Sequence, residues 1–242
     1  LRSEIFTREQ LEKYAVTLAK RHVLLSKPTP ERLLRRLSEN EQILLEVHSL
    51  LTSTLKENNQ VSPAAEWLLD NFYLIEEQIY TGKKHLPKGY SKILPQLLKG
   101  KSAGLPRVYD IAVEIISHSD GHVNLENLTD FIKAYQTENY LNLGELWAIP
   151  IMLRLALIEN LRRLSIEIAQ EITNKASATM WADKMVEAVE KNPRNLVLVI
   201  ADMARADPPM VSSFVAELTR RLQEKGSTLS LPLNWIEQRV SE

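Results

Sequence analysis

Acidic side chains recur along residues 64–79, and carboxylates in such number could carry out acid–base chemistry. Glu66, Asp70 and Glu77 share one face of a helix with Tyr73, because helix positions 0, 4, 7 and 11 superpose. Glycoside hydrolysis needs two carboxyl groups that face each other across a substrate, whereas these carboxylates form a row. We therefore expect a solvated face or partners for basic groups, and a hydrolase is the least favoured interpretation.

Positive charge concentrates in the next segment. No Asp or Glu lies between Gln78 and Tyr109, and four of the seven glycines fall there. One interpretation is an anionic partner, which would be a phosphate, a lipid headgroup surface or an acidic protein face. The other is a solvated basic linker packed by its own leucines and isoleucines. The candidate anion-binding or partner-binding residues are Lys83, Lys84, Lys88, Lys92, Lys99, Lys101 and Arg107.

Two histidines, His118 and His122, stand four residues apart with Asp120 between them. Such spacing on a helix is typical of a metal-binding pair. The Ser-Asp-Gly sequence between them favours a turn, however, so we expect a polar loop and predict no metal site. The chain also lacks a nucleophile elbow, a zinc-protease helix, a Rossmann fingerprint and a phosphate loop.

Residues 146–158 form an almost wholly apolar run that contains Pro150 and Arg154. A membrane span needs roughly 20 apolar residues, and an arginine at its centre costs about 2.5–3.5 kcal/mol. The run is too short and too costly to span, and a helix that is apolar nearly all round is typical of a protein core. We expect a buried helix that is either kinked at Pro150 or broken so that it restarts there.

Arg154 needs an anionic partner if it is buried in this run. Its neighbours at i−4 and i+4 are Pro150 and Ile158, so the partner has to come from another helix. We predict a buried ion pair with one carboxylate of the 63–80 helix, and the alternative is a ligand-binding arginine. The candidate partners are Glu66, Asp70, Glu76 and Glu77.

The composition indicates which class of protein this chain belongs to. The chain has 242 residues, 44% of them hydrophobic and 25% charged, with a net charge of −1. These values are ordinary for a soluble globular protein and imply no nucleic-acid partner. The absence of cysteine excludes disulfides and thiolate metal sites, and it is compatible with a reducing cytosol.

Apolar residues spaced three and four apart recur along almost the whole chain, and glycine is scarce. This pattern predicts an all-α fold, a bundle of about ten or eleven helices whose last third contains an αα-hairpin with a tight turn at Asp207. We predict one helical domain over residues 1–242, with a possible subdomain boundary near 174–192. The expected helices are 8–25, 31–37, 41–57, 63–80, 107–117, 125–136, 143–172, 176–190, 194–205, 208–224 and 232–240.

Capping signals support these boundaries. Two capping boxes are predicted, one from Thr7 with Gln10 and one from Ser38 with Glu41. An N-cap residue precedes a proline at Ser62-Pro63, Asn192-Pro193 and Asp207-Pro208. Gly82 and Gly226 are expected at helix C-termini. The chain begins at Leu1 and ends within an apolar pattern, so we expect it to be a piece of a longer protein.

Several long blocks occur in a distinctive order: VSPAAEWLLDNFYLIEEQI, HLPKGYSKILPQL, AGLPRVYDIA, FIKAYQ, LNLGELWAIPIMLRLALIENLRRL and PLNWIEQRV. Together they resemble the N-terminal region of cyclic β-1,2-glucan synthases, very large bacterial inner-membrane enzymes. The resemblance implies a parent enzyme that polymerises glucose from UDP-glucose into a cyclic glucan with a divalent metal. It implies that the glycosyltransferase domain and its membrane helices follow this region.

The resemblance carries no catalytic residue or cofactor onto these positions. It implies a cytosolic helical region on the cytoplasmic side of the bacterial inner membrane. The expected partners are the remainder of the same polypeptide and an anionic lipid surface. We therefore expect a non-catalytic scaffold or regulatory region, and the alternative is a free-standing α-helical protein-interaction module.

Overall fold

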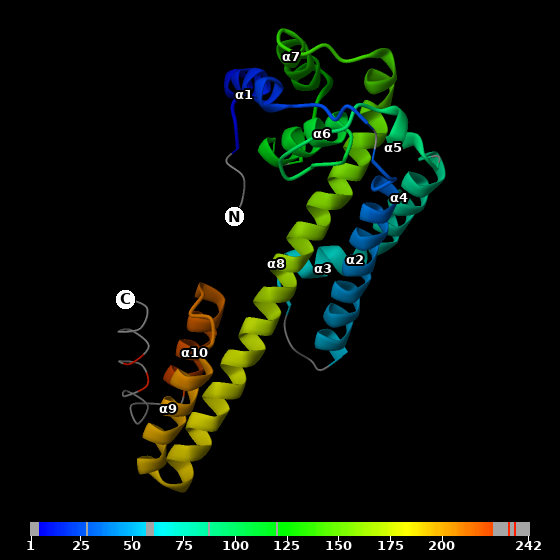
Figure 1. Cartoon of the computed structure of the whole chain (residues 1–242). Coiled ribbons are helices and arrows are strands. Elements are labelled where there is room, and N and C mark those ends of the chain that lie inside the picture. Colours follow the sequence, from blue (N-terminus) through cyan, green and yellow to red (C-terminus); the bar gives the residue numbers. More distant parts are fainter. Residues whose placement is uncertain are drawn as a thin grey trace. The chain divides into compact units, whose positions relative to one another are not determined.

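The computed structural model describes residues 5–27, 29–56, 61–86, 88–119 and 121–224, together with Pro232 and Trp235 (Figure 1). Within these residues the chain forms ten α-helices, one 3-10 turn and no strand, so the predicted all-α class is confirmed. The helices are α1 (Arg8–Arg21), α2 (Leu33–Lys56), α3 (Pro63–Asp70), α4 (Phe72–His85), α5 (Tyr90–Ile93), α6 (Arg107–His118), α7 (Leu125–Gln136), α8 (Leu143–Lys191), α9 (Leu196–Ala206) and α10 (Ser212–Glu224), with the 3-10 turn η1 (Pro193–Asn195) before α9.

The chain divides into two compact units, residues 1–166 and residues 167–242, and the division falls inside α8. The number of domains and the boundary predicted near 174–192 stay predictions.

In the first unit, α1 packs against α7, and α2 packs against α3 and α4. The apolar faces of α1, α6 and α7 meet in one buried cluster, whose members include Leu11, Leu18, Ile115, Phe131 and Tyr135. Burial of such side chains is the main favourable contribution to folding. Four apolar side chains of α3 and α4 are buried as well: Leu68, Phe72, Ile75 and Ile79.

Local signals fixed several helix starts. Thr7 and Gln10 form the predicted capping box, and Ser62 accepts a hydrogen bond from the Ala65 amide ahead of Pro63. At Asn192 the cap and Pro193 begin the 3-10 turn. These residues satisfy amide groups that a helix start leaves without a partner.

Four expectations about boundaries are wrong. The 31–37 and 41–57 segments are one helix, α2, so Ser38 and Glu41 cap nothing. The 63–80 segment is two helices, because the backbone at Asn71 (φ −106°, ψ 10°) leaves the helical geometry between α3 and α4. The 143–172 and 176–190 segments are the single helix α8. The last hairpin helix begins at Ser212 rather than at Pro208.

Packing explains the continuity of α2. Its buried residues Leu33, Leu37, Asn40 and Leu44 continue one face across the point where we expected a break. Tertiary burial of such a face outweighs the local capping preference of a serine.

Gly82 does not end a helix, because it lies inside α4 and is buried. A Cβ atom there would lie 3.4 Å from Leu37 Cδ2 of α2 and 3.5 Å from Leu155 Cδ2 of α8. The small residue therefore lets three helices approach closely.

The run 146–158 lies in α8, and Ala148, Met152 and Leu155 are buried, as predicted for a core helix. It is not buried all round, because 77% of Trp147 is exposed. The helix continues through Pro150, which excludes a restart there, while a kink at this position stays a prediction. Across the described part of the chain, no helix is long and apolar enough to cross a membrane.

In the second unit, α9 and α10 pack on the C-terminal part of α8 around a core that includes Trp181, Met185, Ile200 and Phe214. Asp207 adopts the left-handed conformation (φ 45°) and closes α9, which confirms the predicted αα-hairpin turn. The predicted helix 232–240 lies outside the described residues apart from Pro232 and Trp235, and Gly226 lies outside them too.

A candidate anion-binding groove

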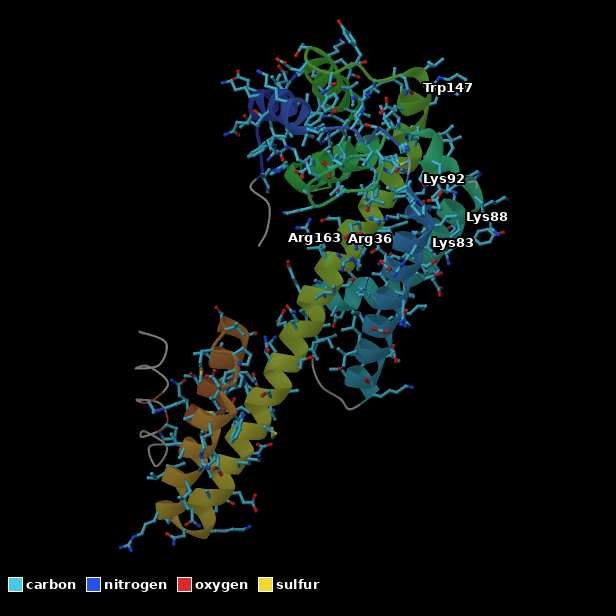
Figure 2. The ribbon with its side chains drawn as sticks, viewed as in Figure 1. Arg36, Lys83, Lys88, Lys92, Trp147 and Arg163 are labelled. Carbon is cyan, nitrogen blue, oxygen red and sulfur yellow. The ribbon has the colours of Figure 1, made fainter. Side chains whose placement is uncertain are left out.

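The predicted basic residues occupy three different settings. Lys84, Lys88, Lys92, Lys99 and Lys101 are exposed, and none of them forms an ion pair with another described residue. Lys83 pairs with Glu41 of α2. Figure 2 shows Lys83, Lys88 and Lys92 over α4 and α5, with Trp147 near the start of α8.

Arg107 is buried rather than exposed. Its Nε and Nη2 atoms donate to the two carboxylate oxygens of Glu145 over 2.6 and 2.8 Å, and Nη2 also donates to the Tyr140 carbonyl over 2.6 Å. The two side chains are 4% and 0% exposed. Burial alone would lower the pKa of Arg107, but the contact with Glu145 raises it. The Arg107 guanidinium is therefore bound internally and does not offer itself to a partner.

Glu145 also caps α8. Its Oε2 atom accepts from the Asn142 amide over 2.9 Å, while its own amide donates to Asn142 Oδ1 over 2.9 Å. This reciprocal pair is a capping box, so one carboxylate joins the starts of α6 and α8. The Asn-x-x-Glu spacing is the sequence signal that could have identified Glu145.

Arg154 is half-buried on α8. Among the described residues, no ion pair joins it to Glu66, Asp70, Glu76 or Glu77, and all four carboxylates are exposed. The predicted pair therefore lacks support in the structure.

Glu159, which directly follows the run 146–158 on α8, receives buried hydrogen bonds instead. Arg36 donates to it twice, over 2.9 and 2.6 Å, while Asn40 donates over 2.8 Å and Arg162 over 2.7 Å. Burial alone would raise the pKa of Glu159, but these donors lower it below its ordinary value.

A groove of about 890 Å³ lies in the first unit, between α1, α6, residues 97–102 and one residue of α8. Four basic side chains line it: Arg21 of α1, Lys99 and Lys101 of the loop, and Arg163 of α8. The structure thus brings two of the predicted lysines together with two arginines that the sequence did not single out. Their separation along the chain leaves no local signal that could have linked them.

Hydrogen-bonded polar groups form the walls of this groove. His22 places Nε2 3.0 Å from Asp110 Oδ2 and Nδ1 2.8 Å from the Tyr135 hydroxyl, and Ser102 donates to the same aspartate. These contacts fix the wall formed by α1 and α6.

Also between α1 and α6, the Tyr14 hydroxyl donates to Glu114 over 2.6 Å and accepts from Arg21 over 3.2 Å. Burial and the hydrogen bond to Glu114 raise the pKa of Tyr14 to about 12, so the phenol stays protonated at neutral pH.

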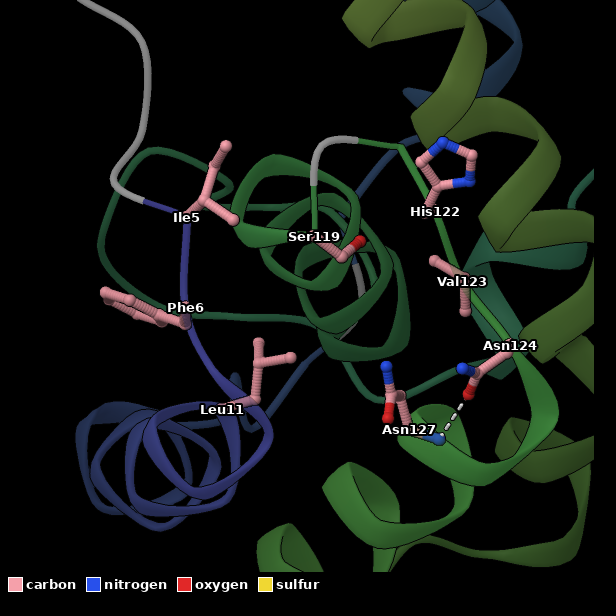
Figure 3. A pocket seen from close by; sticks show the side chains of 8 residues that line it. All are labelled: Ile5, Phe6, Leu11, Ser119, His122, Val123, Asn124 and Asn127. Atoms are coloured by element: carbon pink, nitrogen blue, oxygen red, sulfur yellow. Dashed lines mark hydrogen bonds between the residues drawn. The ribbon is translucent and has the colours of Figure 1, made fainter.

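The two histidines of the predicted loop face different cavities. His118 lines the groove and stacks on Phe6, with ring centroids 4.1 Å apart. His122 lines a separate pocket of about 310 Å³, with Phe6, Leu11 and Asn124 among its other walls (Figure 3). Within the described ranges, no group of three or more acidic or histidine side chains is placed to hold a metal ion.

No family model matches the chain. The chain is 29% identical, over 241 residues, to the cyclic beta-(1,2)-glucan synthase NdvB of Rhizobium meliloti (strain 1021). It is a helical region related to part of a cyclic β-1,2-glucan synthase. The match covers 99% of this chain but 8% of the length of that synthase.

Proposed function

We propose that the chain is the non-catalytic scaffold or regulatory region of a cyclic β-1,2-glucan synthase. The similarity to NdvB along 99% of the chain is the observation that carries the proposal. In this proposal the region precedes the membrane part and lies on the cytoplasmic side of the bacterial inner membrane. UDP-glucose and the divalent metal are used by the remainder of the polypeptide, which is the partner of this region.

The interior polar groups support a scaffold. Arg107 and Glu145 join α6 to α8, and Glu159 joins α8 to α2 through Arg36 and Asn40. Buried carboxylates with this many donors hold helices in register, because breaking one contact leaves an uncompensated charge inside the protein.

Removal of residues 1–242 from the synthase that carries them tests the scaffold role. We expect the isolated chain to show no glucose transfer from UDP-glucose, and the truncated synthase to make less cyclic glucan than the intact one. Radiolabelled glucose incorporation and mass spectrometry of the rings measure both. Glucose transfer by the isolated chain would refute a non-catalytic role, and unchanged ring synthesis after truncation would refute the scaffold or regulatory role.

The exposed cations favour an anionic lipid surface as a second partner. Lys84, Lys88 and Lys92 have no ion pair within the described residues, and each lysine near an anionic membrane contributes about 1 kcal/mol. Exposed Tyr140 and Trp147 add the amphipathic rings that prefer a membrane interface.

Vesicle flotation tests this partner. Vesicles with anionic lipid should bind the chain, and the triple change Lys84→Glu, Lys88→Glu and Lys92→Glu should abolish that binding. The matched control changes Lys13→Glu and Lys133→Glu, which lie on α1 and α7. Equal binding to neutral vesicles, or no binding to either kind, contradicts the proposal.

A further inference from the structure

The groove gathers cations that have no acidic partner. Lys99 and Lys101 form no ion pair among the described residues, and Arg21 donates to the Tyr14 hydroxyl instead of to a carboxylate. Arg163, half-buried, donates to the Ser117 hydroxyl over 3.3 Å. A guanidinium partly removed from water favours a negatively charged partner.

The two carboxylates in the groove offset only part of this positive charge. Asp110 is hydrogen-bonded to His22 and Ser102, and Glu114 accepts from Tyr14 and lies 3.4 Å from His118 Nε2. Four cations therefore face two carboxylates that already have partners of their own. A concave surface with excess charge of one sign attracts ligands of the opposite sign.

The volume and the remaining walls restrict the ligand further. About 890 Å³ falls within the range of roughly 300–1,000 Å³ that is usual for small-molecule sites. Leu18, Leu97 and Val113 supply apolar wall beside the cations. The groove thus suits a molecule with a charged head and an organic body, and arginine is well matched to phosphate oxygens.

We propose that the groove formed by Arg21, Lys99, Lys101 and Arg163 binds a phosphate-bearing small molecule, with the phosphates on these cations and the organic part against Leu18, Leu97 and Val113. This site goes beyond the scaffold role and does not depend on it. The same phosphate chemistry is offered by a soluble organic phosphate and by a phospholipid headgroup.

Calorimetric titration of the chain with inorganic pyrophosphate at low salt tests the site. We expect saturable binding that the double change Lys99→Ala and Lys101→Ala weakens by about tenfold or more, because it removes two of the four cations that line the groove. Arg163→Gln should weaken binding by a similar factor. The matched control, Lys13→Ala with Lys133→Ala, removes two exposed lysines of α1 and α7 that lie outside the groove, and it should change affinity less than twofold.

Vesicle flotation of the same variants distinguishes the two sources of phosphate. If pyrophosphate binds and only the groove variants weaken that binding, the ligand is a soluble phosphate. If pyrophosphate does not bind, but anionic vesicles bind and the groove variants lose that binding, the ligand is a lipid headgroup. Absence of both kinds of binding, or equal weakening in the Lys13 and Lys133 control, overturns the site. Circular dichroism of each variant confirms that the fold is retained, and the result is independent of glucan synthesis by the synthase.

Discussion

Among the described residues of the first unit, Glu159 is the carboxylate that accepts the most hydrogen bonds. It receives four hydrogen bonds from Arg36, Asn40 and Arg162, and its side chain is 8% exposed. Because these donors lower its pKa below the ordinary value of 4.5, folding favours the ionised form. The stabilisation is complete above about pH 4.5 and is lost as the pH falls through the lowered pKa.

Glu159→Gln should therefore reduce the free energy of unfolding at pH 7 by about 1–2 kcal/mol. The loss is smaller than for a fully buried ion pair, because the Arg36 side chain is 41% exposed and solvent screens its charge. The variant should also lose less stability than the native chain between about pH 5 and pH 3. Urea unfolding at several pH values measures both effects. Glu66→Gln, at an exposed carboxylate, is the matched control, and parallel pH profiles for all three proteins would contradict this role of Glu159.

The spacing of apolar and charged residues predicts which helix faces are buried better than it predicts which side chains of different helices meet. Lys99 and Lys101 were identified from charge alone, yet Arg21 and Arg163 join them only through the packing of α1 and α8 around α6. The same kind of long-range packing places Arg107 in a buried ion pair with Glu145, although the sequence predicted it at the surface. Periodicity specifies which side of a helix is buried, but it does not specify which other helix lies there.

At the scale of the element, helix ends were predictable where residues close in sequence determine them. The caps at Thr7 and Ser62 and the turn at Asp207 depend on residues close in sequence, so the sequence was sufficient there. The continuity of α2 depends on the burial of one face along its length, which the local capping signal at Ser38 did not reveal.

Gly82 distinguishes the two cases. As a helix C-terminus it would favour positive φ, and alanine would destabilise the protein. Inside α4, Gly82→Ala should stabilise the protein by about 0.5–1 kcal/mol, because the new Cβ lies at ordinary contact distance from Leu37 and Leu155. Gly82→Leu should destabilise it by about 1–3 kcal/mol through overpacking.

Thermal and urea unfolding measure both variants. Gly89→Ala is the control, because Gly89 has a φ of 83° and alanine there is strained. A destabilising Gly82→Ala change would show that α4 does not continue through this position.

At the scale of the whole molecule, each unit buries a core of its own. One buried cluster of the first unit joins α1, α6 and α7, and apolar side chains of α2, α3, α4 and α8 are buried in that unit as well. The core of the second unit joins α9, α10 and the C-terminal part of α8. Two cores allow local opening of one unit without the other, so one unfolding free energy does not describe the whole chain. The groove lies entirely in the first unit and should therefore be insensitive to the second core.

Phe214→Ala tests this separation, because Phe214 is fully buried in the second core. The change should destabilise that unit by about 3–5 kcal/mol through the cavity it leaves. Hydrogen exchange should show faster exchange over residues 178–222, unchanged protection in α1, α6 and α7, and unchanged pyrophosphate affinity of the groove. Leu11→Ala, in the core of the first unit, should give the opposite pattern. If Phe214→Ala instead removed protection from α1 and α7 to the same extent, the two cores would be one cooperative unit joined through α8, and the groove would be sensitive to both.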